Sequence, residues 1–133
     1  MPRNVLLIAI RLIVSLNLLF AAVALKFAGN PLSIEAFTRM SHAVHGLISE
    51  PVFRIGSGIV ETSLALLFLI PKSARLAAAL IVLWMSGALL SHILVLGYGV
   101  FFLDALVVFL LPCLYLVVTR NRSAQFLAST PAL

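Results

Sequence analysis

Ionisable side chains interrupt the long apolar stretches of this 133-residue sequence. Each is costly to place in hydrocarbon, so residues of this kind are functional candidates by default. Glu61 is the most informative, because it lies near the middle of its apolar stretch and must be either protonated or paired there. An isolated acid at that depth costs about 2.5–3.5 kcal/mol. We predict a ligand-binding pocket formed by Glu61 together with Lys26, Arg54, His92 and Asp104.

These residue types suit the binding of a small apolar molecule that carries a carbonyl group, such as a quinone. His92 or Arg54 would donate a hydrogen bond to the carbonyl, and Glu61 or Asp104 would exchange protons with it. The sequence has one cysteine, Cys113, and therefore no cysteine pair; it also has no flavin motif and no convincing haem ligands. The quinone hypothesis thus assumes no intrinsic cofactor, and the electrons would have to come from a partner.

The same charges also have a purely structural interpretation. Buried ion pairs and polar residues fix the register and order of helices in a bundle. Arg11 is long enough to reach the depth of Glu61, so we predict these two residues as structural buried charges. For the pocket residues, the sequence leaves the structural and the ligand-binding roles open.

His42 and His45 are three positions apart (i,i+3) in a predicted helix, a spacing at which two imidazoles can share a metal ion. No third ligand is adjacent in the sequence, and two ligands alone are a weak signal, so we predict no metal site. The serines have no nearby base, and the glycines fit no phosphate-binding loop. No self-contained catalytic motif is visible, which leaves open whether the protein is an enzyme.

The composition indicates the elements that must position these residues. Hydrophobic residues make up 63% of the chain, only nine basic and four acidic residues are present, and the mean hydropathy is +1.22. A domain this small is mostly surface, and a composition this apolar cannot supply a polar surface. The composition therefore excludes a soluble globule, a disordered chain and a disulfide scaffold. A membrane-spanning helix needs about 20 apolar residues. The sequence predicts one all-α domain over 1–133, an antiparallel bundle of four transmembrane helices at about 5–25, 52–70, 74–96 and 100–119.

The basic residues lie at the ends of the apolar runs rather than on one exposed face. This distribution sets membrane topology and does not indicate nucleic-acid binding. Short turns force neighbouring helices to be antiparallel, so both termini lie on one side. That side carries more basic residues than the other, which predicts cytoplasmic termini. The basic residues of the first side are Arg3, Lys72, Arg75, Arg120 and Arg122, and those of the second are Lys26, Arg39 and Arg54.

The loop 27–50 contains an amphipathic pattern, with apolar residues recurring at helical spacing. Asn30-Pro31 is a typical helix start, and Glu35 and Arg39 are spaced to pair along a helix. We expect a short helix at the membrane interface or folded over the mouth of the bundle. The polar tail 120–133 is expected to fray. The apolar stripe of the loop comprises Ile34, Phe37, Met40, Val44 and Leu47.

The second and third predicted spans resemble the DoxX and DoxX-like family of small four-helix membrane proteins. The resemblance covers about residues 20–118 and implies the same bundle, in a bacterial plasma membrane. Named members include a subunit of an archaeal thiosulfate:quinone oxidoreductase and partners of bacterial membrane oxidoreductases; a related branch contains a chaperone for nicotinic receptors. Arg54, Glu61 and His92 match the polar pattern of the family. The resemblance rests on Pro51, Phe53-Arg54, Gly58, Glu61, the run 70–75, Ala77-Ala78, the run 85–88, His92, Lys26-Phe27 and Asn30-Pro31.

Two functional hypotheses follow. In the first, the chain is a non-catalytic or ligand-binding subunit of a membrane redox complex and holds a quinone-like molecule. In the second, it is an assembly factor or chaperone-like scaffold with no chemistry of its own. The small-residue faces around Gly56-Gly58 and Ser86-Gly87 would then dock another membrane protein. The partners implied are the lipid bilayer, a quinone or similar apolar molecule, and a second membrane or peripheral protein.

Overall fold

The computed structural model describes the backbone of residues 2–128 and the side chains of residues 2–120. The described part is helical, without strands. Two of the helices continue without a break into π-helical segments, labelled η1 and η2. The elements are α1 (Arg3–Phe20), η1 (Ala21–Phe27), α2 (Pro31–Ala43), α3 (Glu50–Leu69), α4 (Ala74–Ser91), η2 (His92–Leu96) and α5 (Val100–Ala128).

Within the described residues, four helical stretches are long and apolar enough to cross a membrane. Each matches a predicted span to within a few residues, which confirms the all-α, four-helix fold class of an integral membrane protein. Helix α5 continues beyond the predicted end of the last span and runs to Ala128; residues 129–133 of the tail lie outside the described part. The four stretches are Arg3–Phe27, Glu50–Leu69, Ala74–Leu96 and Val100–Arg120.

Helix α1 fixes the register of its two neighbours. Ser15 Oγ donates to the carbonyl of Ala65 on α3 at 3.0 Å, and Arg11 Nε donates to the carbonyl of Phe68 at 2.9 Å. Towards α5, the Arg3 guanidinium donates to the backbone carbonyl of Val118. Polar side chains that bond carbonyls of a neighbouring helix hold the two backbones in a set alignment, because few alternative partners exist in hydrocarbon.

The tightly packed core lies in the half of the bundle that contains the N-terminus and the α3–α4 turn. Phe68 of α3 is fully buried and meets Tyr115 of α5 edge to face, with ring centroids 5.1 Å apart. Helix α4 begins with small residues that recur on one buried face, which allows a close approach of its neighbours. The core residues include Ile10, Val14, Phe68, Ala74, Ala77, Ala78, Ile81, Val108 and Tyr115.

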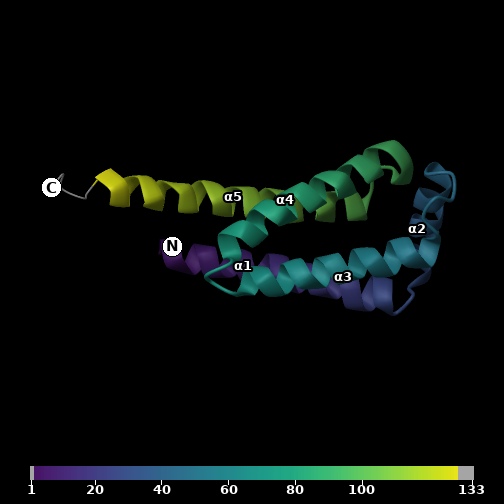
Figure 1. Cartoon of the computed structure of the whole chain (residues 1–133), viewed down its shortest axis with the longest axis horizontal. Helices are drawn as coiled ribbons and strands as arrows, with labels where there is room; N and C mark the ends of the chain where they lie inside the picture. Colours follow the sequence, from purple (N-terminus) through teal and green to yellow (C-terminus); the bar gives the residue numbers. More distant parts are fainter. Residues whose placement is uncertain (1, 129–133) are drawn as a thin grey trace.

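The four long helices form two pairs (Figure 1). Helix α1 packs along α3, and α4 packs along α5. The N-terminus and the α3–α4 turn lie at one end of the bundle, and α2 stands across the opposite end of the α1–α3 pair. We refer to this opposite end as the α2 end. The core packs the two pairs against each other in the half with the N-terminus. At the α2 end the two pairs are therefore joined less closely.

Helix α2 forms where the loop pattern predicted a helix. The side chain of Asn30 caps its first turn by accepting a hydrogen bond from the backbone N–H of Leu32 at 3.0 Å, and Pro31 occupies the first position. Phe37 is buried, with its ring centroid 5.9 Å from that of Phe53 on α3. The Arg39 guanidinium donates to the carbonyl of Val95 in η2 at 2.7 Å. Helix α2 thus bridges both helix pairs, and of the two predicted placements the one over the bundle mouth is observed.

The apolar stripe predicted for the loop is shorter than expected. Helix α2 ends at Ala43, and Leu47 lies beyond it and is 87% exposed. The end has the hydrogen bonds of a Schellman motif: the N–H of Gly46 bonds the carbonyl of Ser41, and the N–H of His45 bonds the carbonyl of His42. His45 occupies the left-handed position at φ 54°, where glycine is the usual residue.

Replacing His45 by glycine is expected to stabilise the protein by about 0.5–1 kcal/mol, because a side chain in the left-handed region is strained. The matched control is His42→Gly, which lies inside α2 and should lower stability by about 1 kcal/mol. Thermal unfolding of the purified chain in detergent measures both shifts. Equal destabilisation by the two glycines would show that the motif is absent.

Candidate functional site

A cavity of about 1040 Å³ opens between the two helix pairs at the α2 end. Its walls come from all five labelled helices together with both π-helical segments, and most lining side chains are apolar. Four of the five predicted pocket residues line it, namely Lys26, Glu61, His92 and Asp104. Side chains that lie far apart in the sequence therefore line one space.

A buried ion pair between Lys26 and Glu61 lies in the cavity wall. The two residues are 9% and 7% exposed, so both charges are withdrawn from solvent and each offsets the burial of the other. Lys26 belongs to η1, a widened turn of a kind that is rare and often found at functional sites. The lysine reaches along α3 from the α2 end towards the middle of the bundle, where Glu61 lies.

The indole of Trp84 on α4 faces the same carboxylate. Its Nε1 lies 3.5 Å from Glu61 Oε1, the weak limit of a hydrogen bond. Trp84 also lines the cavity. Trp84 was not among the predicted site residues, because a tryptophan in the middle of a span usually packs against apolar neighbours. The signal that would have identified it is its place opposite Glu61 across the short α3–α4 turn.

A second polar contact crosses the cavity from α1 to α5. Asn17 Nδ2 donates to Asp104 Oδ1 at 2.7 Å, and both residues line the cavity. The antiparallel register of α1 and α3 places Glu61 opposite the turn of α1 that follows Asn17. The carboxylates of Glu61 and Asp104 are therefore within about one helical turn of each other along the bundle axis. Asn17 was not among the predicted site residues.

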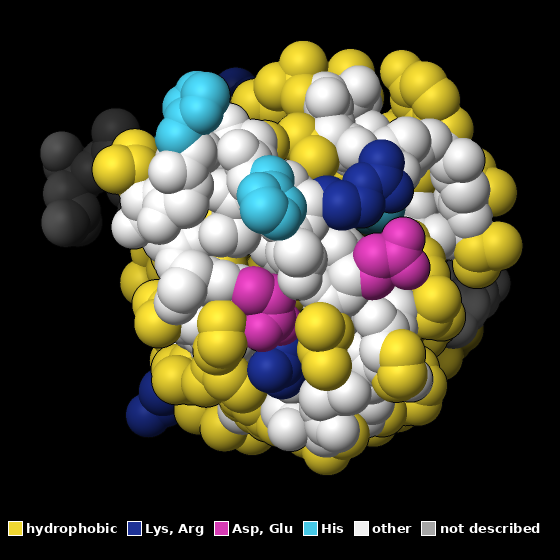
Figure 2. Space-filling model, turned by 90° about the vertical axis from the view of Figure 1, so that its right-hand side faces the viewer, with side chains coloured by type: hydrophobic (Ala, Val, Ile, Leu, Met, Phe, Trp, Pro, Cys, Tyr) yellow, Lys and Arg dark blue, Asp and Glu magenta, His cyan; other side chains and the backbone are white. Residues whose placement is uncertain are grey.

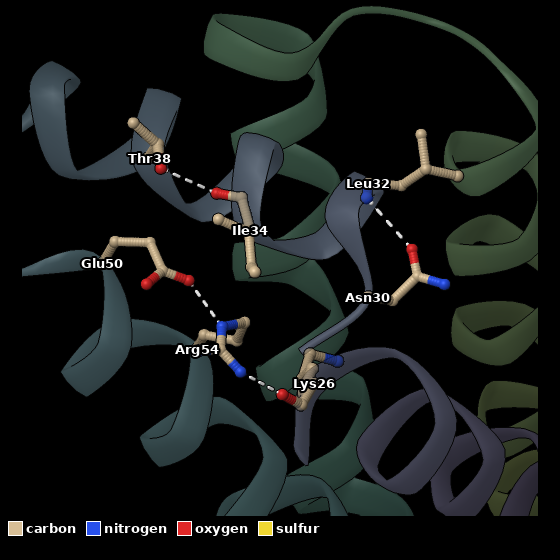
Figure 3. A network of polar contacts seen from close by, with 7 residues as sticks. All are labelled: Lys26, Asn30, Leu32, Ile34, Thr38, Glu50 and Arg54. Carbon is tan, nitrogen blue, oxygen red and sulfur yellow. Dashed lines mark hydrogen bonds and ion pairs between the residues drawn. The ribbon is translucent and has the colours of Figure 1, made fainter. Parts of the chain in front are cut away.

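Arg54 lies outside the cavity lining, although it was predicted as a pocket residue. Its Nε lies 2.5 Å from Glu50 Oε1, and its Nη1 donates to the backbone carbonyl of Lys26 (Figure 3). The guanidinium therefore holds the C-terminal end of η1 against α3. Arg54 acts on the site by positioning the lysine that reaches Glu61.

The approach of η1 to α3 also depends on Gly58. A Cβ at this position would lie 2.6 Å from Cε1 of Phe27, closer than real Cβ contacts. Gly58 thus accepts an aromatic ring from its own chain, in agreement with the expectation that small residues allow close approach. Two other glycines, Gly56 and Gly87, line the cavity and have open space around them.

His92 begins η2, where the α4 span ends. Its Nδ1 lies 3.2 Å from the carbonyl of Gly97, and its ring stacks edge to face with Phe102 at a centroid distance of 6.1 Å. Tyr98 also lies edge to face with Phe102, at a centroid distance of 5.0 Å. These three rings form the aromatic wall of the cavity next to the α4–α5 turn.

Arg11 does not pair with Glu61. Its guanidinium donates to the carbonyls of Phe68 and Leu69, the last residues of α3. These carbonyls have no partner within the helix, because α3 ends at Leu69 and the chain becomes extended at Ile70. The acceptors of Arg11 are thus backbone carbonyls and not a carboxylate, and its predicted structural role remains a prediction.

The α2 end carries the remaining polar residues of the predicted loop (Figure 2). Histidine and charged side chains gather near the centre of this face, with hydrophobic side chains around them. Glu35 and Arg39 do not form the ion pair that their spacing allows, because Arg39 is turned towards Val95. Among the described residues, the ion pairs join Lys26 to Glu61 and Glu50 to Arg54. His42 and His45 are exposed there, and the described residues contain no group of three metal-ligating side chains.

Comparison of the chain with protein-family models, with curated proteins and with solved structures found no match.

Proposed function

We propose that this protein is a DoxX-like, non-catalytic subunit of a membrane redox complex and that it binds a quinone-like apolar molecule in the cavity at the α2 end. The observation that carries the proposal is the buried Lys26–Glu61 pair with Trp84 beside it in a largely apolar wall. Apolar pockets with a few convergent polar groups are the usual sites of small-molecule binding.

The donors of the site have capacity left for a ligand. The ammonium group of Lys26 can donate three hydrogen bonds, and Glu61 is its one acceptor among the described residues. The indole N–H of Trp84 is at the weak limit of a bond to Glu61. A carbonyl oxygen placed between them would accept from both, which gives Lys26 and Trp84 the role that the sequence assigned to His92 or Arg54.

The size and openness of the cavity fit a ligand that arrives from the bilayer. Its volume is at the upper end of the range of about 300–1,000 Å³ for small-molecule sites. Two exposed apolar residues of α4, Leu80 and Leu83, are part of its lining. Gly56 of α3 and Gly87 of α4 also line the cavity, and a Cβ on either would meet no atom within 4 Å. A ring with an alkyl tail could therefore enter between these two helices.

We propose a bacterial plasma membrane as the location, with both termini in the cytoplasm. The support comes from the distribution of basic residues. Arg3, Lys72, Arg75 and Arg120 lie at the end of the bundle with the termini, where the positive-inside rule expects them.

The alternative role, a scaffold for another membrane protein, receives less support. Two of the small residues that were expected to dock a partner are used within the chain. Gly58 is covered by Phe27, and Gly87 lines the cavity. A scaffold also has no need of a buried ion pair beside a cavity, so this role gives no reason for the Lys26–Glu61 pair.

Fluorescence of Trp84, the single tryptophan of the chain, tests the proposal. Titration of the detergent-solubilised protein with a short-chain quinone should quench it saturably. Glu61→Gln should weaken binding by about tenfold, since it removes the charge that holds Lys26 in place. Ser63→Ala, on the exposed face of α3, should bind like the wild type.

Quenching that rises linearly in the wild type, as it would for free indole in the same micelles, would contradict the proposal. Saturable binding with the same affinity in Glu61→Gln would show that the ligand does not bind at the ion pair.

A further inference from the structure

The charges that line the cavity do not balance. Lys26 and Arg39 face three carboxylates, those of Glu35, Glu61 and Asp104. This excess of acid lies in a chain whose formal net charge is +5. Both cations are already committed, because Lys26 pairs with Glu61 and Arg39 donates to a backbone carbonyl. Glu35 and Asp104 therefore have no cationic partner within 4 Å among the described residues.

Asp104 is the deeper of the two and lies one turn inside a membrane-spanning helix. Its Oδ1 accepts from the amide of Asn17, which is neutral. An amide donor orients a carboxylate but supplies no opposite charge, and a carboxylate in a span is costly without one. The side chain is exposed and is part of the cavity lining. The site is thus incomplete in a way that a cation would correct.

The surroundings of Asp104 favour an organic cation. Phe101 precedes it by one turn, and the ring of Phe102 makes edge-to-face contacts with the rings of Tyr98 and His92. All four rings line the cavity. Aromatic faces attract cations, most strongly when the site is desolvated. The walls offer ring faces and aliphatic groups around one acidic oxygen, which suits a charge buried in an apolar body.

We infer that the cavity selects a lipophilic cation, an ammonium or phosphonium group on a bulky apolar body, whose charge lies at Asp104. This rests on the proposed function, because it assumes that the cavity takes an apolar molecule from the bilayer. It adds that the apolar molecule carries a cationic group, which Asp104 recognises. The ion pair of Lys26 and Glu61 supplies the polar contacts at the far side of the same space.

Tetraphenylphosphonium and tetraphenylborate test the inference, because they share one shape and carry opposite charges. Each is titrated into the full chain in neutral detergent, with partition into empty micelles subtracted and Trp84 fluorescence as the signal. Tetraphenylphosphonium should bind at least about tenfold more tightly than tetraphenylborate. Asp104→Asn should remove most of this preference, and Asp104→Glu should keep tetraphenylphosphonium affinity within a factor of about three.

Lys72→Gln is the control for net charge, since it changes the charge of the chain by one unit at an exposed residue outside the cavity; its preference should equal that of the wild type. Equal affinity for the two ions, or tighter binding of the anion, would overturn the inference, as would unchanged tetraphenylphosphonium binding in Asp104→Asn. A wild-type chain that binds a short-chain quinone but neither ion preferentially would refute the cation selectivity alone. A chain that binds no quinone and no ion would refute both proposals.

Discussion

Replacing Lys26 by methionine is expected to lower the free energy of unfolding by about 3–5 kcal/mol, the usual cost of leaving one member of a buried ion pair without its partner. Methionine keeps most of the length of the lysine stem but provides no charge for Glu61, which is 7% exposed. The carboxylate would then be buried against apolar side chains and a weakly bonded indole. Thermal or denaturant unfolding in detergent measures the loss.

The double variant Lys26→Met/Glu61→Met separates the pair from the two positions. Apolar replacement of a whole buried ion pair is often neutral or stabilising, so the double variant should recover most of the stability lost in Lys26→Met. Additive losses in a double-mutant cycle would show that the two side chains do not interact. A double variant that is stable but no longer binds the ligand would show that the pair serves ligand binding and is not needed to fix the register of the helices.

Replacing Arg11 by methionine is expected to lower the free energy of unfolding by about 2–3 kcal/mol. The guanidinium bonds the carbonyls of Phe68 and Leu69, and hydrogen bonds to charged donors are the stronger ones. Without Arg11, the C-terminal carbonyls of α3 lose their donor next to the packed core. The same unfolding measurement reports the loss.

Arg11→Lys is the matched control. It keeps the charge but replaces the planar fork by a single ammonium group, so its stability should lie between those of the wild type and Arg11→Met. Equal stability of all three chains would contradict the assignment of Arg11 as the cap of α3.

Hydropathy and spacing were sufficient to predict the four spans, because each long apolar run has only one way to cross a membrane. They also predicted α2, since Asn30-Pro31 is a strong start signal and Phe37 belongs to its apolar stripe. The end of α2 was predicted too late. That end depends on the left-handed backbone at His45. A histidine, unlike a glycine, does not indicate a helix end in the sequence, so the helix was expected to continue.

The candidate site was predicted in part. Lys26, Glu61, His92 and Asp104 were selected because charge in a span is costly, and the structure brings them to one cavity. Asn17 was not selected, because its role depends on a partner from α5. The acceptors of Arg11 could not be predicted, since every helix has free carbonyls and the sequence does not show which end lies nearby.

The cavity itself has no sequence signal. It exists because α1 packs on α3 and α4 packs on α5 while the core residues hold the pairs together near the termini. The π-helical turns that carry Lys26 and His92 are equally absent from the pattern, because neither a proline nor a glycine lies within Ala21–Phe27 or His92–Leu96. Tertiary packing decides both features.

Native mass spectrometry of the protein, gently extracted from its own membrane, tests most directly whether this cavity holds a small molecule. The account predicts a retained mass of an apolar ligand on the wild-type chain. It should persist in Ala79→Phe, which adds a ring to the exposed face of α4 outside the cavity, and it should be lost in Gly87→Phe, which fills the cavity. A wild-type chain that carries no small molecule, or a ligand that Gly87→Phe retains, would contradict the account.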